Sequence, residues 1–373
     1  MSMFRTQAVV SMENGESVLA AMLDHLQEHV TVERTDAGAH ITSPFGTVDI
    51  TRRDDDVLVD VASGSVEVLG MIRIFVAEHI VEFAGESASI VWSGDGTAAG
   101  VPAHFQKLTV AGVSNVTPRM RRLVLSCENV AACASDSRYH IRLLLPPAGR
   151  APRWPTIGAD GRIQWPTGED ALANRVYTIR SVDAEAGRIA IDFVLHDNAG
   201  PASAWAASAQ PGDVVGMLGP IGSAPGPAAR YLLAGDETAL PAISRLLESL
   251  PAQSRGLALI EVADAAEEQD IGNRTAIGVR WLHRNGADAG TLLQDAVRAQ
   301  PAPADDDDVF VWVSCEFAAF KAIRAHVRKH WGRPKERHLI TAYWRRGSSE
   351  DGLLDSEADM ENGEHSHRAE RRH

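Results

Sequence analysis

The chain has 373 residues, of which 45% are apolar, 23% are charged and 3 are cysteines, and its formal net charge is −14. This length predicts two or three domains, each long enough to bury its own core. The acidic total argues against general affinity for nucleic acid, and the sequence lacks the apolar run of about 18 residues that spans a membrane. The first residues show no export signal and the cysteines show no disulfide framework, so we expect a cytoplasmic protein.

Charge is divided unevenly along the chain. Residues 1–100 carry a formal charge of −11 and residues 348–373 carry −5, whereas residues 101–347 carry +2. Such asymmetry indicates separate units with separate roles. A local basic pocket for an anionic ligand is therefore compatible with the acidic total.

The first predicted unit, residues 1–96, is a compact α+β module. Apolar residues at helical spacing predict one helix over residues 17–30, with Ser17 as its N-cap, and a second over residues 66–84. Alternating apolar residues predict short strands at residues 30–34, 47–51, 57–61 and 89–92. The Gly-rich residues 93–100 have the composition of a linker.

Three histidines of this module, His25, His29 and His79, could meet as metal ligands, because two of them are spaced i, i+4 on one predicted helix. No Glu-x-x-His pattern or nearby cysteine accompanies them. Ordinary surface or core histidines are therefore the favoured interpretation, and no metal site is predicted.

The second predicted unit, residues 103–228, consists of short β-rich runs separated by Pro and Gly. Strands are expected at residues 105–113, 121–126, 139–145, 175–181, 188–194 and 214–218. Several short strands at this spacing are typical of a small antiparallel β-barrel.

In the third predicted unit, residues 229–347, strands alternate with helices, which is typical of an α/β domain with a parallel sheet. The expected strands are 231–235, 257–262, 278–282, 309–314 and 339–344, and the expected helices are 239–250, 290–299 and 317–330. Ligands of such sheets bind at the carboxyl ends of the strands. Residues 348–373 have almost no apolar content and are predicted to be a disordered acidic tail.

The string that is most informative about function is Arg175-Val176-Tyr177-Thr178-Ile179-Arg180, on a predicted barrel strand. An Arg, a Tyr and a Thr alternating on one face can hold an anion, stack on an aromatic ring and donate a hydrogen bond, which are the needs of a flavin. Taken alone, the string is more simply an exposed strand face. A second string, His196 followed by Gly200-Pro201, favours the flavin, because the chain turns there into a helix whose free N–H groups suit a pyrophosphate.

Four strings follow one another in a fixed order between residues 104 and 347. They are Arg175-x-Tyr177-Thr178-x-Arg180, His196 with Gly200-Pro201-Ala202 and Trp205, Gly235-Asp236-Glu237-Thr238-Ala239-Leu240-Pro241-Ala242-Ile243, and Tyr343-Trp344-Arg345-Arg346-Gly347. Together they resemble the siderophore-interacting proteins, flavin-dependent ferric-siderophore reductases of the ferredoxin-NADP reductase superfamily. The G-x-G-x-x-G of a plain dinucleotide fold does not follow the first α/β strand.

This resemblance implies an FAD-binding barrel followed by an NAD(P)H-binding α/β domain, with NADH or NADPH as the electron donor. It also implies a ferric siderophore, a small anionic iron chelate, as the partner that is reduced to release Fe(II). The residues implied to bind the cofactors are Arg175, Tyr177, Thr178, Arg180, His196, Gly200, Pro201, Ala202, Trp205, Gly235, Asp236 and Thr238. No residue is assigned a catalytic role, because the flavin carries the chemistry.

A basic pocket is expected for an anionic chelate. Residues 321–346 contain nine basic residues and one acidic residue, most of which are expected on a solvated helix face and loop. Arg345 and Arg346 differ, because they stand in the terminal string. In the strand before the flavin string, Arg142 takes the place of a lysine common in the family, with the charge preserved and the geometry changed. The resemblance thus implies Arg142, Arg345 and Arg346 as substrate-binding residues.

Two positions depart from the family pattern. Ile221 stands in Gly219-Pro220-Ile221-Gly222 where relatives commonly have an arginine, which suggests a less anionic or differently recognised chelate. Cys315 stands where relatives have a glycine. It could approach the nicotinamide, but a buried structural cysteine is the favoured interpretation.

The choice of nicotinamide is left nearly open by the sequence. Glu261 and Asp264 follow the second α/β strand, where a carboxylate favours a ribose hydroxyl and so tilts slightly to NADH. Arg280 and Arg284 could reverse this preference.

The first module resembles a small uncharacterised domain that is sometimes found beside these reductases, through His25, His29, Phe45-Gly46 and His79. That resemblance implies no activity, and chelate delivery, dimerisation and a lid over the flavin all stay open. Two other functions fit the same strings. One is a general NAD(P)H:flavin or quinone reductase, which needs no basic pocket, and the other is a non-enzymatic flavin-containing protein that binds siderophores or senses iron.

Overall fold

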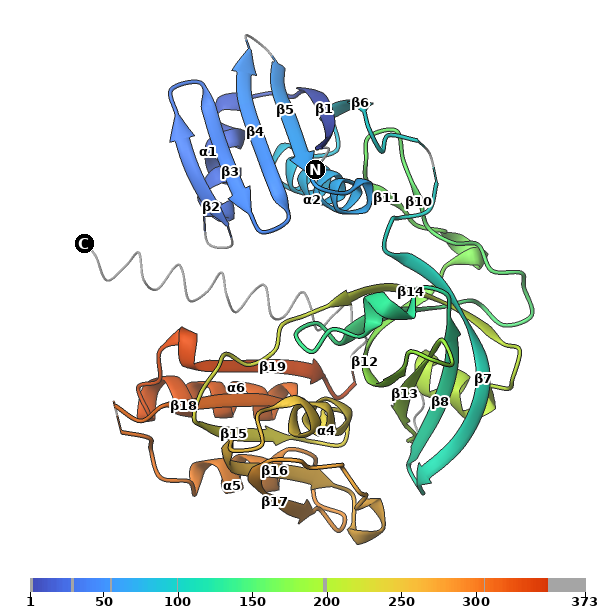
Figure 1. Ribbon diagram of the computed structural model, residues 1–373, viewed down its shortest axis with the longest axis vertical. Coiled ribbons are helices and arrows are strands. Elements are labelled where there is room, and N and C mark those ends of the chain that lie inside the picture. The colour runs from blue at the N-terminus through green and yellow to red at the C-terminus, as the bar shows by residue number, and fades with distance from the viewer. Residues whose placement is uncertain are drawn as a thin grey trace. The chain divides into compact units, whose positions relative to one another are not determined.

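The computed structural model of the protein describes residues 3–27, 30–53, 56–98, 100–196, 200–304 and 306–347 (Figure 1). The chain divides into two compact units: the first runs to Phe105 and also includes Pro146–Leu172, and the second comprises Gln106–Leu145 and the residues from Ala173 onward. The predicted tail, residues 348–373, lies outside the described residues. Among the described helices, none combines the length and the apolar character needed to cross a membrane.

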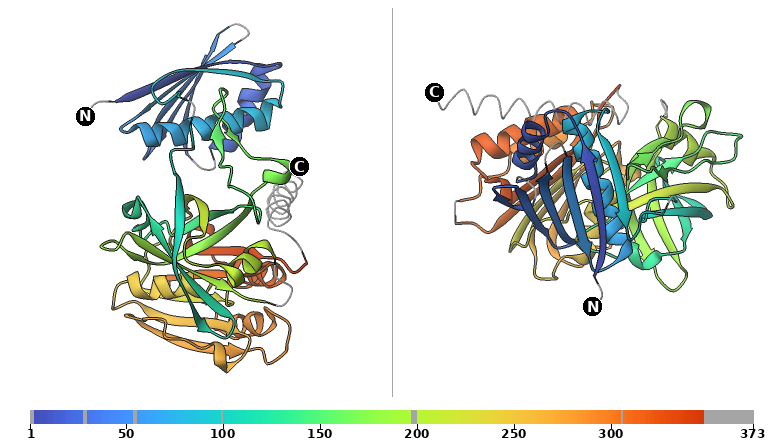
Figure 2. Two further views of the ribbon diagram at one scale, coloured as in Figure 1. Left: turned by 90° about the vertical axis from the view of Figure 1, so that its right-hand side faces the viewer. Right: turned by 90° about the horizontal axis from the view of Figure 1, so that it is seen from above.

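A six-stranded antiparallel sheet, in the order β2-β3-β4-β5-β1-β6, forms most of the first unit. Its strands are β1 (Phe4–Ser11), β2 (Thr31–Thr35), β3 (Gly38–Ser43), β4 (Gly46–Arg53), β5 (Asp56–Ser63) and β6 (Ser89–Gly94). Burial alternates along β1 and β4, because one face packs on the helices α1 (Gly15–Leu26) and α2 (Val66–Ala84) and the other face is open (Figure 2). This confirms the predicted α+β module.

The ends of the first helix differ from the prediction. The helix begins at Gly15 and ends at Leu26, and its N-cap is Asn14 in a left-handed conformation (φ 53°). Ser17 lies inside the helix, where its hydroxyl donates a hydrogen bond to the carbonyl oxygen of Asn14 (3.0 Å). Asparagine tolerates the left-handed region better than most residues, so it, rather than the serine, turns the chain into the helix.

Strands β1 and β3 were not predicted from the sequence. β1 pairs with both β5 and β6, so a strand from the start of the chain completes the interior of the sheet. Of the three histidines, His25 and His79 have ring centroids 5.7 Å apart, and His79 Nδ1 lies 2.8 Å from the carbonyl oxygen of Phe75. His29 lies outside the described residues.

A closed six-stranded barrel, in the order β12-β13-β8-β7-β14-β9, begins the second unit and confirms the predicted antiparallel barrel. Its strands are β7 (Phe105–Thr117), β8 (Met120–Cys127), β9 (His140–Leu145), β12 (Ala173–Asp183), β13 (Arg188–Val194) and β14 (Val214–Ile221). Inward-facing aliphatic side chains fill its interior, and helix α3 (Pro201–Ser208) packs against the same core.

The chain leaves the barrel between β9 and β12. Residues 146–172, here called the excursion, form the hairpin β10 (Thr156–Ile157) and β11 (Ile163–Gln164), and this excursion belongs to the first compact unit. The compact units therefore divide the chain differently from the predicted boundary, which assigned all of residues 103–228 to the barrel.

A five-stranded parallel sheet, in the order β17-β16-β15-β18-β19, completes the second unit and confirms the predicted α/β layer. Its strands are β15 (Arg230–Gly235), β16 (Arg255–Val262), β17 (Ala276–His283), β18 (Val309–Glu316) and β19 (His338–Trp344). Its helices are α4 (Leu240–Ser249), α5 (Thr291–Arg298) and α6 (Phe317–Ala325), the last followed by a π-helical turn, His326–His330. All eight residues of β18 are buried, because both of its faces are covered.

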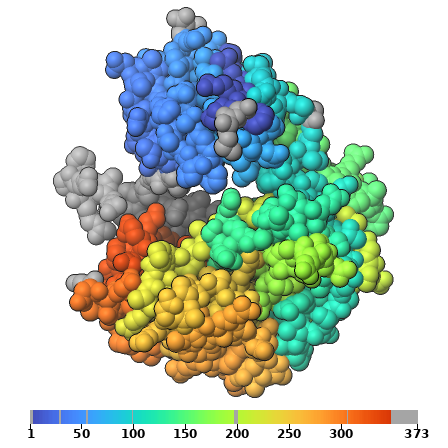
Figure 3. All heavy atoms as spheres, in the orientation of Figure 1, coloured from blue at the N-terminus to red at the C-terminus, as the bar shows by residue number. Residues whose placement is uncertain are grey.

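The barrel and the parallel sheet are in extensive contact within the second unit (Figure 3). Buried Arg245 of α4 donates hydrogen bonds to the carbonyl oxygens of Ile179 (2.9 Å) and Ser135 (2.7 Å). On another part of this contact, the Thr117 hydroxyl donates to Glu267 (2.5 Å), and both groups are buried. Buried, satisfied polar contacts of this kind fix the two layers in one arrangement.

Candidate functional site

Strand β12 carries the first functional string. Arg175 and Tyr177 are partly buried and share one face of the strand, opposite Leu143 and Ile141 of β9. Thr178 is buried on the other face, so the expectation that Arg, Tyr and Thr share one face is wrong. Side chains alternate along a strand with a period of two, and positions 177 and 178 must diverge.

An aromatic chain joins the first string to the second. The Tyr177 and Phe193 ring centroids are 4.3 Å apart, and those of Phe193 and Trp205 are 5.9 Å apart. These three rings come from β12, β13 and α3. Phe193, which belongs to neither string, therefore brings together two strings that are separated by about 20 residues along the chain.

Helix α3 begins at the second string as predicted, with Gly200 as its N-cap and Pro201 in its first turn. No side chain caps this helix start, and the amides of Ala202 and Ser203 belong to the first turn, which has no intrahelical acceptors. Gly200 is exposed and Ala202 is buried. His196 is exposed just after β13, and residues 197–199 lie outside the described residues.

Arg180, the last residue of the first string, is buried and pairs with another residue of the protein. Its guanidinium donates to both carboxylate oxygens of Glu248 on α4, at 2.8 and 3.1 Å. This bidentate pair joins the barrel strand to the α/β layer. The sequence could not foresee it, because the two residues are 68 positions apart.

The third string lies at the topological switch point of the parallel sheet. β15 and β18 are neighbours, and the connections that leave them lead to opposite edges of the sheet. Gly235 ends β15, where a Cβ atom would come within 2.5 Å of Ala239 Cβ and 2.8 Å of the Ser314 carbonyl oxygen. Open α/β sheets bind their ligands at this point, and the close approach of strand and helix requires glycine.

Asp236 binds the third string to the fourth. Its carboxylate accepts hydrogen bonds from the Thr238 hydroxyl (2.5 Å), from Trp344 Nε1 (2.8 Å) and from the Glu316 amide (3.0 Å). Asp236 is fully buried, and burial together with the charge of Glu237 raises its pKa to about 6. Asp236 therefore holds the carboxyl ends of β15, β18 and β19 together, and Thr238 donates a hydrogen bond to its carboxylate.

The terminal arginines of the fourth string are exposed and engaged by neighbours on the same edge. The Arg345 guanidinium lies 4.9 Å from the centroid of the Phe317 ring, and Arg346 Nη1 donates to Asp288 (2.7 Å). Glu316 caps α6 through the Ala318 amide (2.5 Å).

On β9, His140 and Arg142 share a face that points out of the barrel. His140 Nε2 lies 2.6 Å from the Tyr343 hydroxyl on β19, so this face of β9 meets the strand that carries the fourth string. Burial, and to a smaller extent the charge of Arg245, lowers the pKa of His140 to about 4. Arg142 is partly buried and makes no side-chain ion pair with any described residue. His140 belongs to none of the four sequence strings.

Comparison with known proteins agrees with this geometry. Models of the siderophore-interacting FAD-binding domain and of siderophore-interacting proteins match residues 109–224 and 228–347, and a model of an uncharacterised bacterial family, DUF2218, matches residues 7–93. The ferric vibriobactin reductase ViuB of Vibrio cholerae is 30% identical over 239 residues, which are 63% of this chain and 88% of ViuB. The chain belongs to the siderophore-interacting protein family.

Solved structures of this family support the same assignment. A siderophore utilization protein from T. fusca is 39% identical, with a TM-score of 0.56 over 66% of this chain and 94% of that one. The siderophore-interacting protein SipS from Aeromonas hydrophila is 29% identical, with a TM-score of 0.59 over 69% of this chain and 98% of that one. An uncharacterised protein of Mycobacterium tuberculosis is 35% identical over 275 residues, 68% of this chain and 94% of that protein.

The residues of this siderophore-interacting protein fit the FAD that its family model implies. The Arg175 guanidinium donates to the neighbouring carbonyl oxygen of Asn174 (2.6 Å) and forms no ion pair within the described residues. The Asn174 side-chain oxygen beside it is buried without a partner, which is typical of a polar atom that a ligand satisfies. The Arg175 guanidinium and the amides in the first turn of α3 are suitable donors for a pyrophosphate.

The carboxylates that favoured NADH accept hydrogen bonds from backbone amides of the protein. Glu261 is fully buried and accepts hydrogen bonds from the Gly290 (2.6 Å) and Leu293 (2.8 Å) amides. Asp264 caps a short 3₁₀ turn through the Ala266 amide. Arg284 is also occupied, by Glu237 and Glu261. The slight preference inferred from Glu261 and Asp264 is therefore not supported, because long-range contacts decide which charges stay available.

The two departures from the family pattern have different surroundings. Ile221 has 38% of its surface exposed, at the end of β14. Cys315 is fully buried in β18, and burial raises the pKa of its thiol well above the usual range. A protonated, enclosed thiol agrees with the structural interpretation of this cysteine.

Most basic residues of the 321–346 segment have structural partners. Arg333 is buried and donates to the Val309 carbonyl oxygen (2.6 Å), and Arg337 pairs with Asp308 (2.7 Å). Lys321 and Arg324 lie over the rings of Phe317 and Phe320. The nine basic residues are therefore not gathered into one pocket, as the solvated-face interpretation predicted for most of them.

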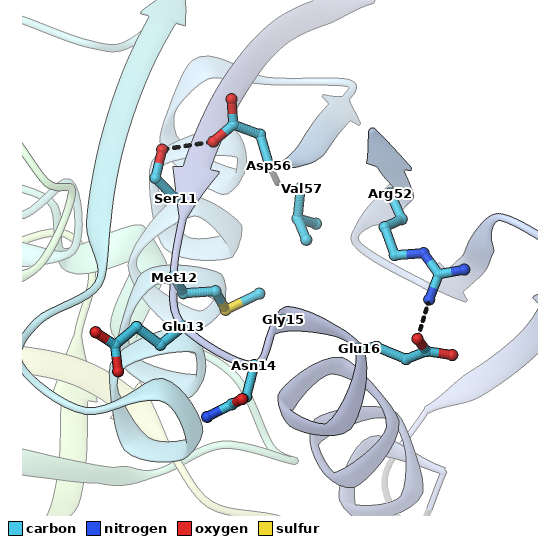
Figure 4. Close-up of a pocket in the computed structure, with 9 residues that line it drawn as sticks. All are labelled: Ser11, Met12, Glu13, Asn14, Gly15, Glu16, Arg52, Asp56 and Val57. Atoms are coloured by element: carbon cyan, nitrogen blue, oxygen red, sulfur yellow. Dashed lines mark hydrogen bonds and ion pairs between the residues drawn. The ribbon is translucent and has the colours of Figure 1, made fainter. Parts of the chain in front are cut away.

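A hollow of about 830 Å³ lies on the first module, between the start of α1 and the adjoining ends of β1, β4 and β5 (Figure 4). Two polar pairs lie in it: Ser11 donates to Asp56 (2.6 Å), and Arg52 pairs with Glu16 (3.0 Å). None of the predicted site residues lines it. These two pairs are exposed to solvent, so we assign the hollow no ligand.

Proposed function

We propose that this protein is an FAD-dependent reductase that transfers electrons from NADH or NADPH to a ferric siderophore and releases Fe(II). The observation that carries the proposal is the convergence of the flavin strings. β12 and α3 meet through the Tyr177, Phe193 and Trp205 rings, and α4, which follows the switch point, is joined to the same β12. A flavin and a nicotinamide dinucleotide would thus bind to the same compact unit.

In this proposal Arg175 and the first amides of α3 bind the FAD phosphates, and Tyr177 packs beside the flavin. His196, Gly200, Pro201, Ala202 and Trp205 complete the site, whereas Arg180 acts through its pair with Glu248. FAD, when bound, accepts a hydride and passes electrons on singly, which matches a two-electron donor to a one-electron acceptor. Gly235, Asp236 and Thr238 shape the edge of the sheet where the nicotinamide dinucleotide binds.

Among the three proposed substrate arginines, Arg142 is the best placed to bind an anionic chelate. It forms no ion pair with any described residue, while Arg346 is paired with Asp288 and Arg345 lies over Phe317. Ile221, exposed where relatives commonly have an arginine, gives the pocket an apolar contact in place of a charge. Hard oxygen ligands hold Fe(III) more tightly than Fe(II), so reduction releases the metal.

We further propose that the reaction takes place in the cytoplasm. Cys127, Cys133 and Cys315 are all free and buried, which suits a reducing compartment. Cys127 and Cys133 have sulfur atoms 3.9 Å apart and still form no disulfide.

The first test is FAD binding by Arg175→Ala. Loss of a charged donor to phosphate should weaken FAD binding by roughly 10- to 100-fold, measured by titration of flavin fluorescence. Arg188→Ala is the matched control, because Arg188 is exposed on the adjacent strand β13 and is not among the predicted site residues. Equal FAD affinity in both variants, or a wild-type protein that takes up no FAD, would overturn the proposed cofactor site.

A further inference from the structure

The excursion between β9 and β12 contacts the first module through the tip of its hairpin, which lies beside β6 and α2 (Figure 1). Trp92 of β6 donates its indole N–H to the Asp160 carbonyl oxygen (2.8 Å). Gly161 is buried against the same ring, and a Cβ atom there would lie 2.6 Å from Trp92 Nε1. The hairpin tip therefore fits closely over the indole edge.

Trp92 belongs to the hydrophobic core of the first module, with 9% of its surface exposed. A buried indole N–H requires an acceptor, and the excursion supplies it. The core of the module is thus completed by a segment that the chain contributes from within the barrel sequence.

Polar contacts surround this central one. Arg162 pairs with both Asp160 (2.8 Å) and Glu86 (3.0 Å), the latter just after α2. The Ile157 amide donates to the Gly100 carbonyl oxygen (2.8 Å). A buried indole contact, an ion-pair network and a backbone hydrogen bond together define an interface rather than a chance approach.

The excursion is continuous at both ends with strands that carry proposed site residues, Arg142 for the chelate on β9 and Arg175 for FAD on β12. It leaves β9 after Leu145, three residues beyond Arg142, and enters β12 at Ala173, two residues before Arg175. An unanchored segment of this length would lose backbone entropy each time it became ordered for binding. Contacts that order it beforehand remove this cost from the binding step.

We propose that the first module is a positioning element for the flavin site: by holding the excursion, it keeps β12 in the conformation that binds FAD. This rests on the proposed function for the identity of the cofactor. The partner of the module is then the excursion of its own chain, and Trp92 and Gly161 are the centre of the contact.

The test is Gly161→Ala, with Gly149→Ala as the matched control. Both glycines belong to the excursion and have positive φ, 88° and 73°, but a Cβ atom at Gly149 would meet no atom within 4 Å. Alanine therefore strains the backbone at both positions and clashes with Trp92 at Gly161 alone. The full-length variants are compared with the wild type by amide hydrogen exchange without FAD and by FAD titration.

We expect Gly161→Ala, and not Gly149→Ala, to raise exchange in residues 146–172 and to weaken FAD binding by about tenfold, as the binding-competent fraction falls. Unchanged exchange in a folded Gly161→Ala protein would overturn the contact. Raised exchange with FAD affinity within twofold of the wild type would overturn the positioning role. A wild type that takes up no FAD would instead defeat the proposed function, and the exchange comparison would still decide whether the module holds the excursion.

Discussion

His140 lies between the barrel and the terminal strand, where burial lowers its pKa to about 4. An unfolded histidine has a pKa near 6.5, so the unfolded state takes up this proton first as pH falls. Stability contributed by neutral His140 is therefore lost as pH falls from about 6.5 to about 4. Asp236 has the opposite effect, because its raised pKa of about 6 makes the folded state take up the proton first.

We predict that His140→Gln flattens the acid dependence of stability. Glutamine can keep a hydrogen bond to the Tyr343 hydroxyl, but it does not titrate. Melting temperatures measured between pH 7 and pH 4.5 should fall less steeply for the variant than for the wild type. Parallel curves for the two proteins would show that His140 contributes nothing to the acid dependence.

At the scale of elements, helix α4 is the joint between the two layers of the second unit. Arg180 and Arg245 cross the joint, the first to Glu248 and the second to backbone oxygens of Ile179 and Ser135. Both arginines are buried, so each depends on its partners for compensation of the lost hydration. The joint gives β12 a fixed relation to the switch point of the sheet.

Glu248→Ala should therefore lower the free energy of unfolding by about 1–3 kcal/mol, because it leaves the buried Arg180 guanidinium without its carboxylate. Chemical denaturation measures the change, provided that different probes first show the affected transition to be two-state. Glu185→Ala, at an exposed turn between β12 and β13, is the control and should change the value by less than about 0.5 kcal/mol. A loss no larger than that of the control would contradict the role of the joint.

Local patterns predicted the elements better than the contacts between them. Alternation and helical spacing located most strands and helices of the barrel and the parallel sheet, because each is decided by residues a few positions apart. β1, β3 and the β10–β11 hairpin were not predicted, because their pairing is long-range or their apolar runs are short. The strings located β12 and α3. No pattern of neighbouring residues showed that Glu261 would accept hydrogen bonds from amides at the start of α5, or that Arg180 would pair with Glu248.

At the scale of the whole molecule, the order of segments along the chain differs from the order in which they pack. The excursion lies within the range of the FAD-binding domain model and yet packs with the module that precedes it. Truncation at residue 96 would remove Trp92 and uncover the hairpin tip. The first module and the excursion therefore form one compact unit, although about 40 residues of the barrel separate them along the chain.

The proposed reduction of a ferric siderophore can be measured by first reducing the FAD-loaded protein anaerobically with NADH or NADPH. A panel of ferric chelates is then added while flavin absorbance and free Fe(II) are followed together. We predict that at least one ferric siderophore reoxidises the flavin rapidly and releases Fe(II) in proportion. Rapid reoxidation by free flavin or quinone with slow reoxidation by every ferric siderophore would contradict the proposed function, as would chelates that bind while the flavin stays reduced.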